Sequence, residues 1–428
     1  MTKTVVVGGG IGGLAAALAV AGRGHQVLVL ERADRFAEIG AGIQLAPNGL
    51  HALDRLGLGD AVRETAVRME ALRFMDGVTG EHVASMPLTG EYRRRFGNPY
   101  VVVHRAELHG LLLDACRRHS GVELRSGSGV TGYEQDGVSA TAVLDDGRRI
   151  RADGLIGADG IHSAVRGQLV GDGPPVVSGL TVYRAVIEMT RVPEELRSAT
   201  VTWWAGPGCH FVHYPIAGGK YLNLAASRDD GATVAFAGVP VTRGRVRREF
   251  TALGEVPHRL LELGEDWRSW VLVDREPVRD WTDGRVALLG DAAHPMLHYA
   301  AQGACQALED AVLLGGMLGV PADEFPARFE KYNAERRDRT AQIQLLARRS
   351  TQLWHPAGQA ARARNALLSA LSATELHDQV GWMHGARSFD SADALPAPGH
   401  DACPVPGPGA CPAPGQDPAV PAPRWAEA

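Results

Sequence analysis

A glycine cluster near the start of the chain lies between an apolar run and an amphipathic repeat. Thr4–Val7 is an apolar run typical of a buried strand, and the segment Gly8-Gly9-Gly10-Ile11-Gly12-Gly13 follows it directly. Helical spacing is then kept by the apolar residues Leu14, Ala17, Leu18 and Ala21. A strand, a glycine-rich turn and a helix in this order predict a βαβ unit with a parallel sheet. All-α and all-β folds are therefore excluded.

The glycines have the G-x-G-x-x-G spacing of a dinucleotide-binding turn. In such a turn the glycines allow a tight bend, a close approach of the backbone to the pyrophosphate, and close packing of helix on strand. A dinucleotide is predicted to bind at Gly8, Gly10, Ile11, Gly12 and Gly13. A second strand, Gln26–Leu30, leads to Glu31 and Arg32, and Glu31 lies 21 positions after Gly10, where an acid commonly binds the ribose. The turn alone does not distinguish FAD from NAD.

Length and charge limit the other possibilities. A chain of 428 residues predicts two or three domains. A net charge of −5 argues against a nucleic-acid partner, and no apolar run approaches the ~18 residues of a membrane span. The chain runs straight into its first strand, so we expect no signal peptide and a cytoplasmic location, with its five cysteines reduced. No metal-ligand spacing is present.

The pattern of predicted strands and helices changes along the chain. Alternating strand and helix patterns predict a discontinuous nucleotide-binding domain at residues 1–70, 101–174 and 275–322. Strand-like segments at 71–100 and 175–274 predict an inserted β-sheet domain for the substrate. Residues 323–394 are predicted to form C-terminal helices. The last 34 residues, 395–428, contain ten Pro and four Gly, which predicts a disordered tail. The expected fold class is α/β with a Rossmann-type domain.

Two later segments repeat the pattern of a strand that ends in glycine and aspartate. In Ala152–Arg166 the apolar run ends at Asp159-Gly160, before Ser163 and Arg166 open a helix. In Gly284–Pro295 the run ends at Gly290-Asp291, and a loop of small residues leads on to Gln302–Ala311.

At these residues the chain resembles the single-component FAD-dependent aromatic hydroxylases, the group of salicylate hydroxylase and 3-hydroxybenzoate 6-hydroxylase. Further segments that carry the resemblance are Gly40–Asn48, His104–Leu108 and Trp382–Gly385. The resemblance extends from Val5 to about Phe389 and leaves out the proline-rich tail. It implies an α/β fold and FAD as the cofactor.

The resemblance also implies which residues contact FAD. Glu31 would bind the adenosine ribose, Val130 would lie near the adenine, and Arg105 and Gln44 would lie along the pyrophosphate and ribityl chain. Near the other motifs, the implied contacts are Asp159 at the pyrophosphate, Asp291 at the ribityl hydroxyls, and the backbone N–H groups of Gly303 and Ala304 at the flavin pyrimidine. Helical spacing over Ala304–Leu314 adds a physical reason, because a helix N-terminus favours a reduced, anionic flavin.

The substrate residues are predicted from a second strand. Side chains alternate along Cys209–Pro215, so His210 and Tyr214 share one face, where they could accept and relay a phenol proton. Relatives have a His and a Tyr at this spacing. His298 stands where relatives often have Pro or Gln, and is either a second proton-transfer group or a hydrogen-bond donor. Pro295 would present its carbonyl to the reacting carbon, and Arg184 either binds a substrate carboxylate or forms a salt bridge.

The resemblance implies a monooxygenase that hydroxylates a small phenolic acid of the hydroxybenzoate class. NADH or NADPH would reduce the flavin, and O2 would then form a C4a-hydroperoxyflavin that attacks the ring. Salicylate-type oxidative decarboxylation and aminohydroxybenzoate hydroxylation fit equally. An FAD oxidase or dehydrogenase, and a flavin-dependent sensor without turnover, are the alternatives from other classes. The ring position, the choice of donor and the oligomeric state, a homodimer included, stay open.

Overall fold

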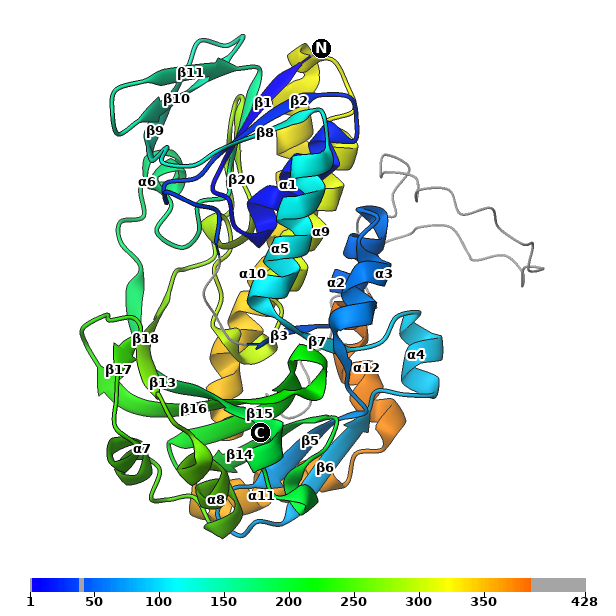
Figure 1. Cartoon of the computed structure of the whole chain (residues 1–428), viewed down its shortest axis with the longest axis vertical. Helices are drawn as coiled ribbons and strands as arrows, with labels where there is room; N and C mark the ends of the chain where they lie inside the picture. The colour runs from blue at the N-terminus through cyan, green and yellow to red at the C-terminus, as the bar shows by residue number, and fades with distance from the viewer. Residues whose placement is uncertain (1, 38–41, 386–428) are drawn as a thin grey trace, which may run out of the picture.

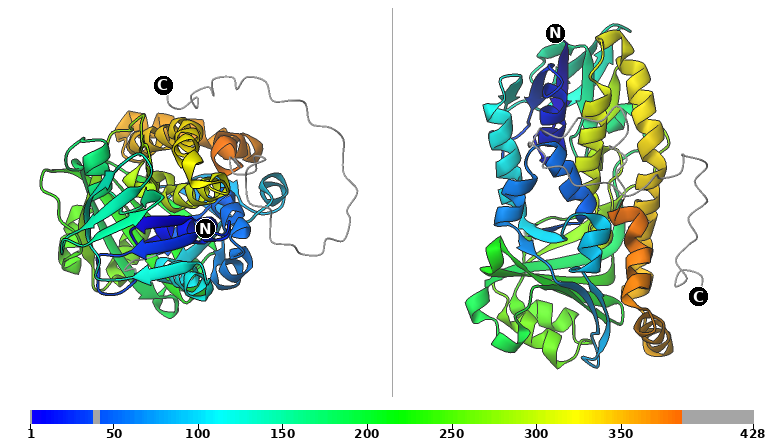
Figure 2. Two further views of the ribbon diagram at one scale, coloured as in Figure 1. Left: turned by 90° about the horizontal axis from the view of Figure 1, so that it is seen from above. Right: turned by 90° about the vertical axis from the view of Figure 1, so that its right-hand side faces the viewer.

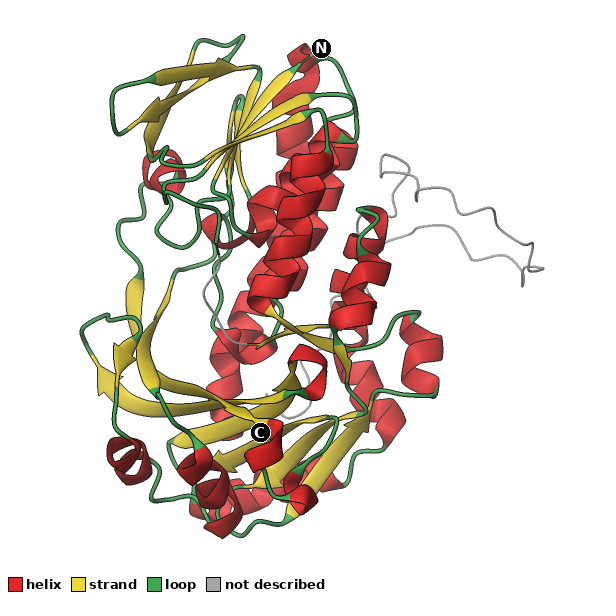
Figure 3. Cartoon of the chain, in the orientation of Figure 1, coloured by secondary structure: helices red, strands yellow, loops and turns green. Residues whose placement is uncertain are grey.

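The computed structural model describes residues 2–37 and 42–385. Gly40 and Ala41 of one motif, and the whole of the predicted tail at 395–428, lie outside the described residues. Two large sheets stand at opposite ends of an elongated molecule, with helices running between them (Figures 1 and 3).

The first sheet contains the glycine turn. Its strands, in spatial order, are β19 (Thr282–Asp283), β20 (Val286–Leu288), β12 (Gly154–Gly157), β1 (Lys3–Val7), β2 (Gln26–Leu30) and β8 (Val122–Arg125). All neighbours are parallel except β19 and β20. Val5, Val6 and Val7 are buried because helices cover this sheet, as expected for a parallel sheet.

Three helices pack side by side along this sheet: α1 (Ile11–Ala21), α5 (Arg105–Arg118) and α9 (Gly303–Met317). Small side chains let α1 and α9 approach closely, since a Cβ on Gly315 would come within 2.4 Å of the Ala19 Cβ. The sequence predicted a helix over Ala304–Leu314, and α9 begins one residue before that range and ends three residues after it.

Smaller elements join this region to the rest of the chain. One antiparallel sheet contains β9 (Val130–Gln135), β10 (Ala140–Leu144) and β11 (Arg149–Ala152). Helix α6 (Ala164–Leu169) comes after β12 in the chain. Another contains β3 (Gly42–Leu45), β7 (Val101–His104) and β4 (Val67–Arg68). The short helices here are α2 (Pro47–Arg55), α3 (Gly59–Thr65) and α4 (Glu91–Phe96).

The second large sheet has eight strands, and all pairs are antiparallel except β14 with β5. In spatial order they are β17 (Val239–Pro240), β18 (Arg268–Asp274), β13 (Val176–Glu188), β16 (Tyr221–Ala232), β15 (Cys209–Ile216), β14 (Thr200–Gly206), β5 (Ala71–Asp76) and β6 (His82–Pro87). Helices α7 (Arg243–Glu249) and α8 (Glu255–Leu263) contribute to the core against one face, where Phe211 is buried. The opposite face is directed toward the first sheet.

The chain ends in three helices. Helix α10 (Phe325–Trp354) has 30 residues and runs along the molecule from the first sheet to the second, and α11 (Gly358–Ser369) and α12 (Ala373–His384) follow (Figure 2). Pro356 lies directly after the C-cap His355, where a helix cannot continue with normal geometry.

The predicted fold class is confirmed: an α/β protein with a Rossmann-type sheet, a second β-sheet region and C-terminal helices. The strands of the larger sheet fall within the segments 71–100 and 175–274, and the division into domains stays a prediction. Within the described residues, no helix is both long and apolar enough to cross a membrane.

Candidate functional site

One cavity of about 730 Å³ extends from the first sheet to the second. It starts at the turn after β1, passes the carboxyl ends of β12 and β20, and reaches the face of the larger sheet formed by β13, β15 and β16. In the first sheet β2 lies on one side of β1 and β12 on the other, so the strand order reverses there. Crevices at such switch points are where α/β sheets bind ligands.

The cavity walls include nearly all residues predicted to bind the cofactor. Gly13 is the exception. The lining ones are Gly8, Gly10, Ile11, Gly12, Glu31, Arg32, Gln44, Arg105, Val130, Asp159, Asp291, Gly303 and Ala304. These positions come from segments far apart in the sequence, so the fold brings the three glycine and aspartate motifs to one place.

Two glycines of the turn leave no room for a side chain. Gly8 has a φ of +105°, and a Cβ there would lie 2.4 Å from the Ala158 carbonyl oxygen. A Cβ on Gly13 would lie 2.0 Å from the Gly8 carbonyl oxygen, so Gly13 serves the packing of α1 on β1 rather than the cavity wall. The first turn of α1 contains no acidic residue, and its N-cap Gly10 provides no side-chain cap. Its backbone N–H groups therefore remain available to an anion.

Glu31 follows β2 and closes the turn. One carboxylate oxygen accepts a hydrogen bond from the Gly9 N–H at 2.8 Å, and the other accepts one from the Ala33 N–H at 2.9 Å. These bonds fix the carboxylate at the cavity wall. Each oxygen keeps a lone pair that a ribose hydroxyl could use.

The two aspartate motifs are joined to each other by Arg166. Its guanidinium is fully buried, donates to the carbonyls of Ala292 and Ala293 at 3.0 and 2.7 Å, and forms an ion pair with Asp172 at 2.7 Å. Asp159 caps the start of α6, where it accepts hydrogen bonds from the Ser163 hydroxyl at 2.5 Å and the Ala164 N–H at 2.8 Å. Asp159 therefore shapes the loop as well as lining the cavity.

The N-terminus of α9 points into the middle of the cavity. Gly303 and Ala304 occupy its first turn, which contains no acidic side chain. A helix of 15 residues presents a partial positive charge there.

A buried charge network fixes α9 against α10. Arg336 forms ion pairs with Glu309 at 2.5 Å and Asp310 at 2.6 Å, and Arg339 pairs with Glu309 at 2.9 Å. His294 forms a further pair with Asp310 at 2.6 Å. Burial alone would raise the pKa of Asp310, but His294 and Arg336 hold it below its usual range. Every charge in this network has a partner.

The other end of the cavity is the face of the larger sheet. Register places Arg184, Ala225, Val212 and Trp203 in one row across β13, β16, β15 and β14. His210 and Tyr214 flank this row on β15, and both line the cavity as the alternation predicted. The opposite face carries Phe211, which packs in the core with α7 and α8.

His210 is buried and forms a hydrogen bond with a second histidine. Its Nδ1 lies 2.9 Å from Nε2 of His355, at the end of α10, and its ring meets the Tyr299 ring edge-on at 5.0 Å. Burial, and then the neighbouring His355 and His298, lower the pKa of His210 well below its usual value. The imidazole is therefore neutral, and a neutral ring can accept a proton.

His298 and Arg184 present polar atoms to the cavity. Both ring nitrogens of His298 are enclosed without a hydrogen-bond partner, and burial, with Arg184 nearby, lowers the pKa of His298 to about 3. The Arg184 Nε is enclosed and unpartnered too, and within the described part of the chain no ion pair involves Arg184. The Arg184 guanidinium also lies over the Trp270 ring, 5.8 Å from its centroid, and its predicted role at a substrate carboxylate stays a prediction.

Two predicted catalytic groups are placed differently from what we expected. Pro295 does not line the cavity, and its carbonyl accepts a hydrogen bond from Gln344 Nε2 at 2.7 Å, because buried Gln344 of α10 needs an acceptor. The Tyr214 hydroxyl donates to the Gly42 carbonyl at 3.0 Å. This hydrogen bond directs the hydroxyl proton at the backbone, and the relay role of Tyr214 stays a prediction.

Sequence reasoning missed the contribution of α10. Trp354 stacks on Trp203 with ring centroids 5.4 Å apart, and His355 contacts His210. Tyr299, Gln302 and Asn223 also line the cavity without having been predicted. The only sequence signal was Trp354-His355-Pro356 at a helix end, which indicates where the helix stops but not what it touches.

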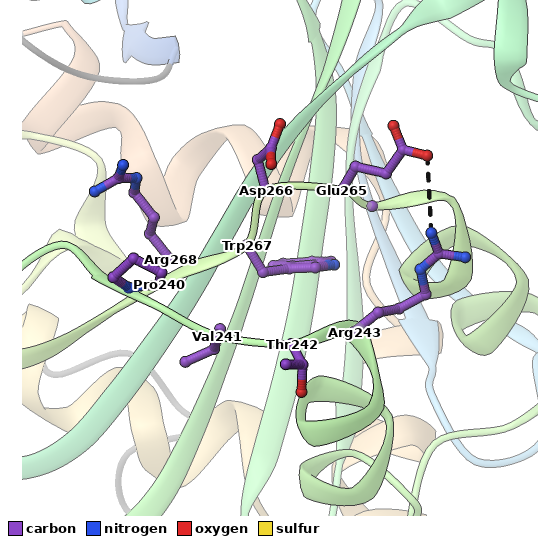
Figure 4. Close-up of a pocket in the computed structure, with 9 residues that line it drawn as sticks. Pro240, Val241, Thr242, Arg243, Glu265, Asp266, Trp267 and Arg268 are labelled. Carbon is purple, nitrogen blue, oxygen red and sulfur yellow. Dashed lines mark ion pairs between the residues drawn. The ribbon is translucent and has the colours of Figure 1, made fainter.

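A second hollow lies away from this cavity, where β17 and β18 meet the start of α7 (Figure 4). Charged side chains border it, and two of them, Arg243 and Glu265, pair at 3.7 Å. The Trp267 ring within it is almost completely buried. Among residues 2–37 and 42–385, no three His, Cys, Asp or Glu side chains are grouped so as to hold a metal ion.

Comparison with known proteins agrees with this geometry. Residues 1–347 match the family model described as an FAD binding domain. Two similar proteins are 3-hydroxybenzoate 6-hydroxylase 1 of Aquipseudomonas alcaligenes, 47% identical over 90% of this chain and 98% of its own, and 3-hydroxybenzoate 6-hydroxylase of Polaromonas naphthalenivorans (strain CJ2), 41% identical over 89% and 95%. A solved salicylate hydroxylase substrate complex is similar with a TM-score of 0.79 and 25% identity, covering 93% of this chain and 98% of that one.

Proposed function

Because the chain belongs to the FAD binding domain family and is an FAD-dependent monooxygenase, we propose that it hydroxylates 3-hydroxybenzoate or a close analogue, at the ring carbon para to the phenol. The observation that carries the proposal is one continuous cavity, which has a glycine cradle at one end and, at the other, the His298 ring nitrogens and the Arg184 Nε without hydrogen-bond partners. The similar 3-hydroxybenzoate 6-hydroxylases support the same substrate class.

The residues of the cradle fit FAD. Gly8–Gly13 and the first turn of α1 would hold the pyrophosphate, Glu31 the ribose, Asp291 the ribityl chain, and the N-terminus of α9 the flavin pyrimidine. When bound and reduced by NADH or NADPH, FAD would activate O2, which supplies the oxygen atom added to the ring. The sequence has one dinucleotide turn, so the nicotinamide donor would use the same cavity. We place the reaction in the cytoplasm, where both donors are available.

The sheet end of the cavity suits a phenolic acid. The Arg184 guanidinium would bind the carboxylate, since it lines the cavity, forms no ion pair among the described residues and has an enclosed Nε without a hydrogen-bond partner. His210 and His298 would face the phenol oxygen, and neutral His210 would accept its proton. Loss of that proton raises the electron density at the para carbon. Trp203 and Tyr299 would exclude water from the ring.

The test is a substrate panel with the FAD-loaded enzyme. NADH and NADPH oxidation is followed with 3-hydroxybenzoate, salicylate, an aminohydroxybenzoate and benzoate, and each product is identified by mass and ring position. We expect 3-hydroxybenzoate to stimulate oxidation most and to yield the para-hydroxylated acid. Benzoate, which lacks the phenol, is the matched control. Carbon dioxide released from salicylate at a higher rate, or hydrogen peroxide as the only product, would overturn the proposal.

A further inference from the structure

Two histidines from distant parts of the chain form a pair at the end of the cavity. His210 lies on β15 and His355 is the C-cap of α10, and Nδ1 of the first is 2.9 Å from Nε2 of the second. Two neutral imidazoles at this distance share one hydrogen, so one ring donates and the other accepts. The pair therefore couples the tautomers of the two rings: when His210 Nδ1 carries the hydrogen, His355 Nε2 accepts it, and the reverse also holds.

The backbone holds His355 in place from both sides. Its N–H donates to the Thr351 carbonyl at 2.9 Å, as the last turn of α10 requires, and its carbonyl accepts the Gly208 N–H at 3.0 Å. Gly208 belongs to the turn between β14 and β15, and this bond attaches the helix end to the strand that carries His210. The stacked Trp354 fixes the same helix end on Trp203. The imidazole pair is thus part of a rigid junction.

His355 lies farther out than His210. The His210 side chain is almost completely enclosed, with 1% of the residue exposed, whereas His355 is half-buried. The Nδ1 of His355 is itself enclosed and has no hydrogen-bond partner. His355 therefore lies between His210 and the surface, and water must reach this enclosed nitrogen for a proton to leave the protein.

We propose that His355 is a positioning residue and proton carrier for His210: it accepts the His210 Nδ1–H, leaves the His210 Nε2 lone pair for the phenol, and passes the phenol proton outward. This inference rests on the proposed function, because it requires a phenolic substrate at His210.

The proton transfers balance without a redox partner. The phenol O–H bond breaks and its proton joins His210 Nε2, which makes His210 an imidazolium. His210 then gives its Nδ1 proton to His355 Nε2, and His355 releases its own Nδ1 proton to water. Phenolate remains in the cavity, and both histidines are neutral again. The starting tautomers return when His355 Nδ1 takes up a proton from water, His355 Nε2 passes its proton back to His210 Nδ1, and His210 Nε2 gives its proton to the product oxygen.

The surrounding charges favour outward movement. His210 faces His298 and Tyr299 from the loop before α9, His355 from α10, and the Arg184 cation on the same face of the sheet. These groups and the enclosure disfavour a positive His210. Burial lowers the pKa of His355 to about 4, but the Asp229 carboxylate on β16 acts in the opposite direction. The positive charge is therefore less unfavourable on His355 than on His210.

The test uses FAD-loaded enzyme without NADH or NADPH, so no turnover occurs. The probe is a nitro-substituted 3-hydroxybenzoate, whose phenolate has an absorption band that its phenol lacks. Rapid mixing below the probe's own pKa follows phenolate formation, and an indicator dye in weak buffer follows the proton that is released. For wild type we expect both signals together. For His355→Gln, which can hydrogen-bond but cannot carry a proton, we expect phenolate formation about 100-fold slower.

Three controls separate relay from structure. The affinity of His355→Gln for the probe above its pKa should stay within a factor of about two of wild type, since the probe then arrives deprotonated. Imidazole in the buffer should restore the rate of His355→Ala. His377→Gln changes another buried histidine, which binds the Pro87 carbonyl on β6 far from the pair, and should leave the rate unchanged.

The outcomes distinguish the two proposals. If the probe and 3-hydroxybenzoate leave the flavin spectrum of wild type unchanged, the proposed function fails. If the probe binds as phenolate but His355→Gln forms phenolate and releases the proton as fast as wild type, the role of His355 is overturned while the proposed function stands.

Discussion

Behind the glycine-turn end of the cavity the buried arginines form ion pairs, whereas at the sheet end two side chains present nitrogens without hydrogen-bond partners. Arg166 and Arg336 are both fully buried and both form ion pairs within the protein. Arg184 and His298 face the same cavity with enclosed nitrogens that lack partners. A buried polar group without a partner is unfavourable in the protein alone. The difference indicates which polar groups maintain the fold and which are available to a ligand.

The comparison predicts opposite effects for substitutions at the two ends. Changes near the glycine turn should affect cofactor retention and stability, and changes at the sheet end should affect substrate binding while the fold persists. The following experiments test this division.

Gly8→Val should have the largest effect. Its Cβ would lie 2.4 Å from the Ala158 carbonyl, and the φ of +105° is strained for valine. We expect protein purified without flavin and activity reduced by at least about 1000-fold, measured by the flavin absorbance per protein and by NAD(P)H oxidation. Gly24→Ala is the matched control, because Gly24 has a φ of +86° but open space around it. A yellow, active Gly8→Val enzyme would contradict the cradle.

Arg336→Met should mainly destabilise the fold. It leaves the buried carboxylates of Glu309 and Asp310 without their guanidinium, which costs about 3–5 kcal/mol. Urea unfolding measures the change. Arg125→Met, which removes an exposed pair with Glu123, should cost less than about 1 kcal/mol. Equal losses in the two variants would show that the network contributes nothing beyond a surface pair.

Arg184→Met should weaken substrate binding and leave stability intact. Removing a charge-assisted bond to the carboxylate should raise KM about 100-fold, with a smaller change in kcat. The melting temperature should change by little, since the substitution removes an enclosed Nε that lacks a hydrogen-bond partner and loses only the contact with the Trp270 ring. Arg268→Met on the adjacent strand, directly opposite Arg184, is the control. A KM within twofold of wild type would remove Arg184 from the substrate site.

His298→Gln should change how stability depends on pH. The pKa of His298 is about 3 in the folded protein, below its usual 6.5, so the unfolded chain binds the proton more tightly. Stability is therefore lost as pH falls below 6.5, by up to about 2 kcal/mol for this group at pH 5. The variant should lose correspondingly less between pH 7 and pH 5 in urea unfolding. The exposed His82→Gln is the control, and an unchanged slope in His298→Gln would contradict this prediction.

The sequence predicted the cofactor end better than the substrate end, for a physical reason. The turn from Gly8 to Gly13 binds through the backbone geometry of six consecutive residues, so its role can be recognised from the local sequence alone. Strand alternation also placed His210 and Tyr214 on one face. The same local reasoning could not show that Gln344 would take the Pro295 carbonyl, since that bond depends on how a distant helix packs.

The substrate end is assembled from long-range contacts. His355 reaches His210 across 145 positions of sequence, and only the packing of α10 determines that they meet. The helical pattern at 323–394 indicated that helices follow, but not which sheet they would cover. Groups whose partners come from tertiary packing are therefore the ones that the sequence did not reveal.

Helix α10 has a mechanical consequence for the enzyme. Phe325 at its start packs near Gly154 of the first sheet, Arg336 binds α9, and Trp354 at its end stacks on Trp203. Each residue of a helix advances about 1.5 Å and turns about 100°. One residue inserted between Arg336 and Trp354 would swing the aromatic end around the helix axis, away from the sheet. The number of residues between Arg336 and Trp354 is therefore as constrained as the identity of these two residues.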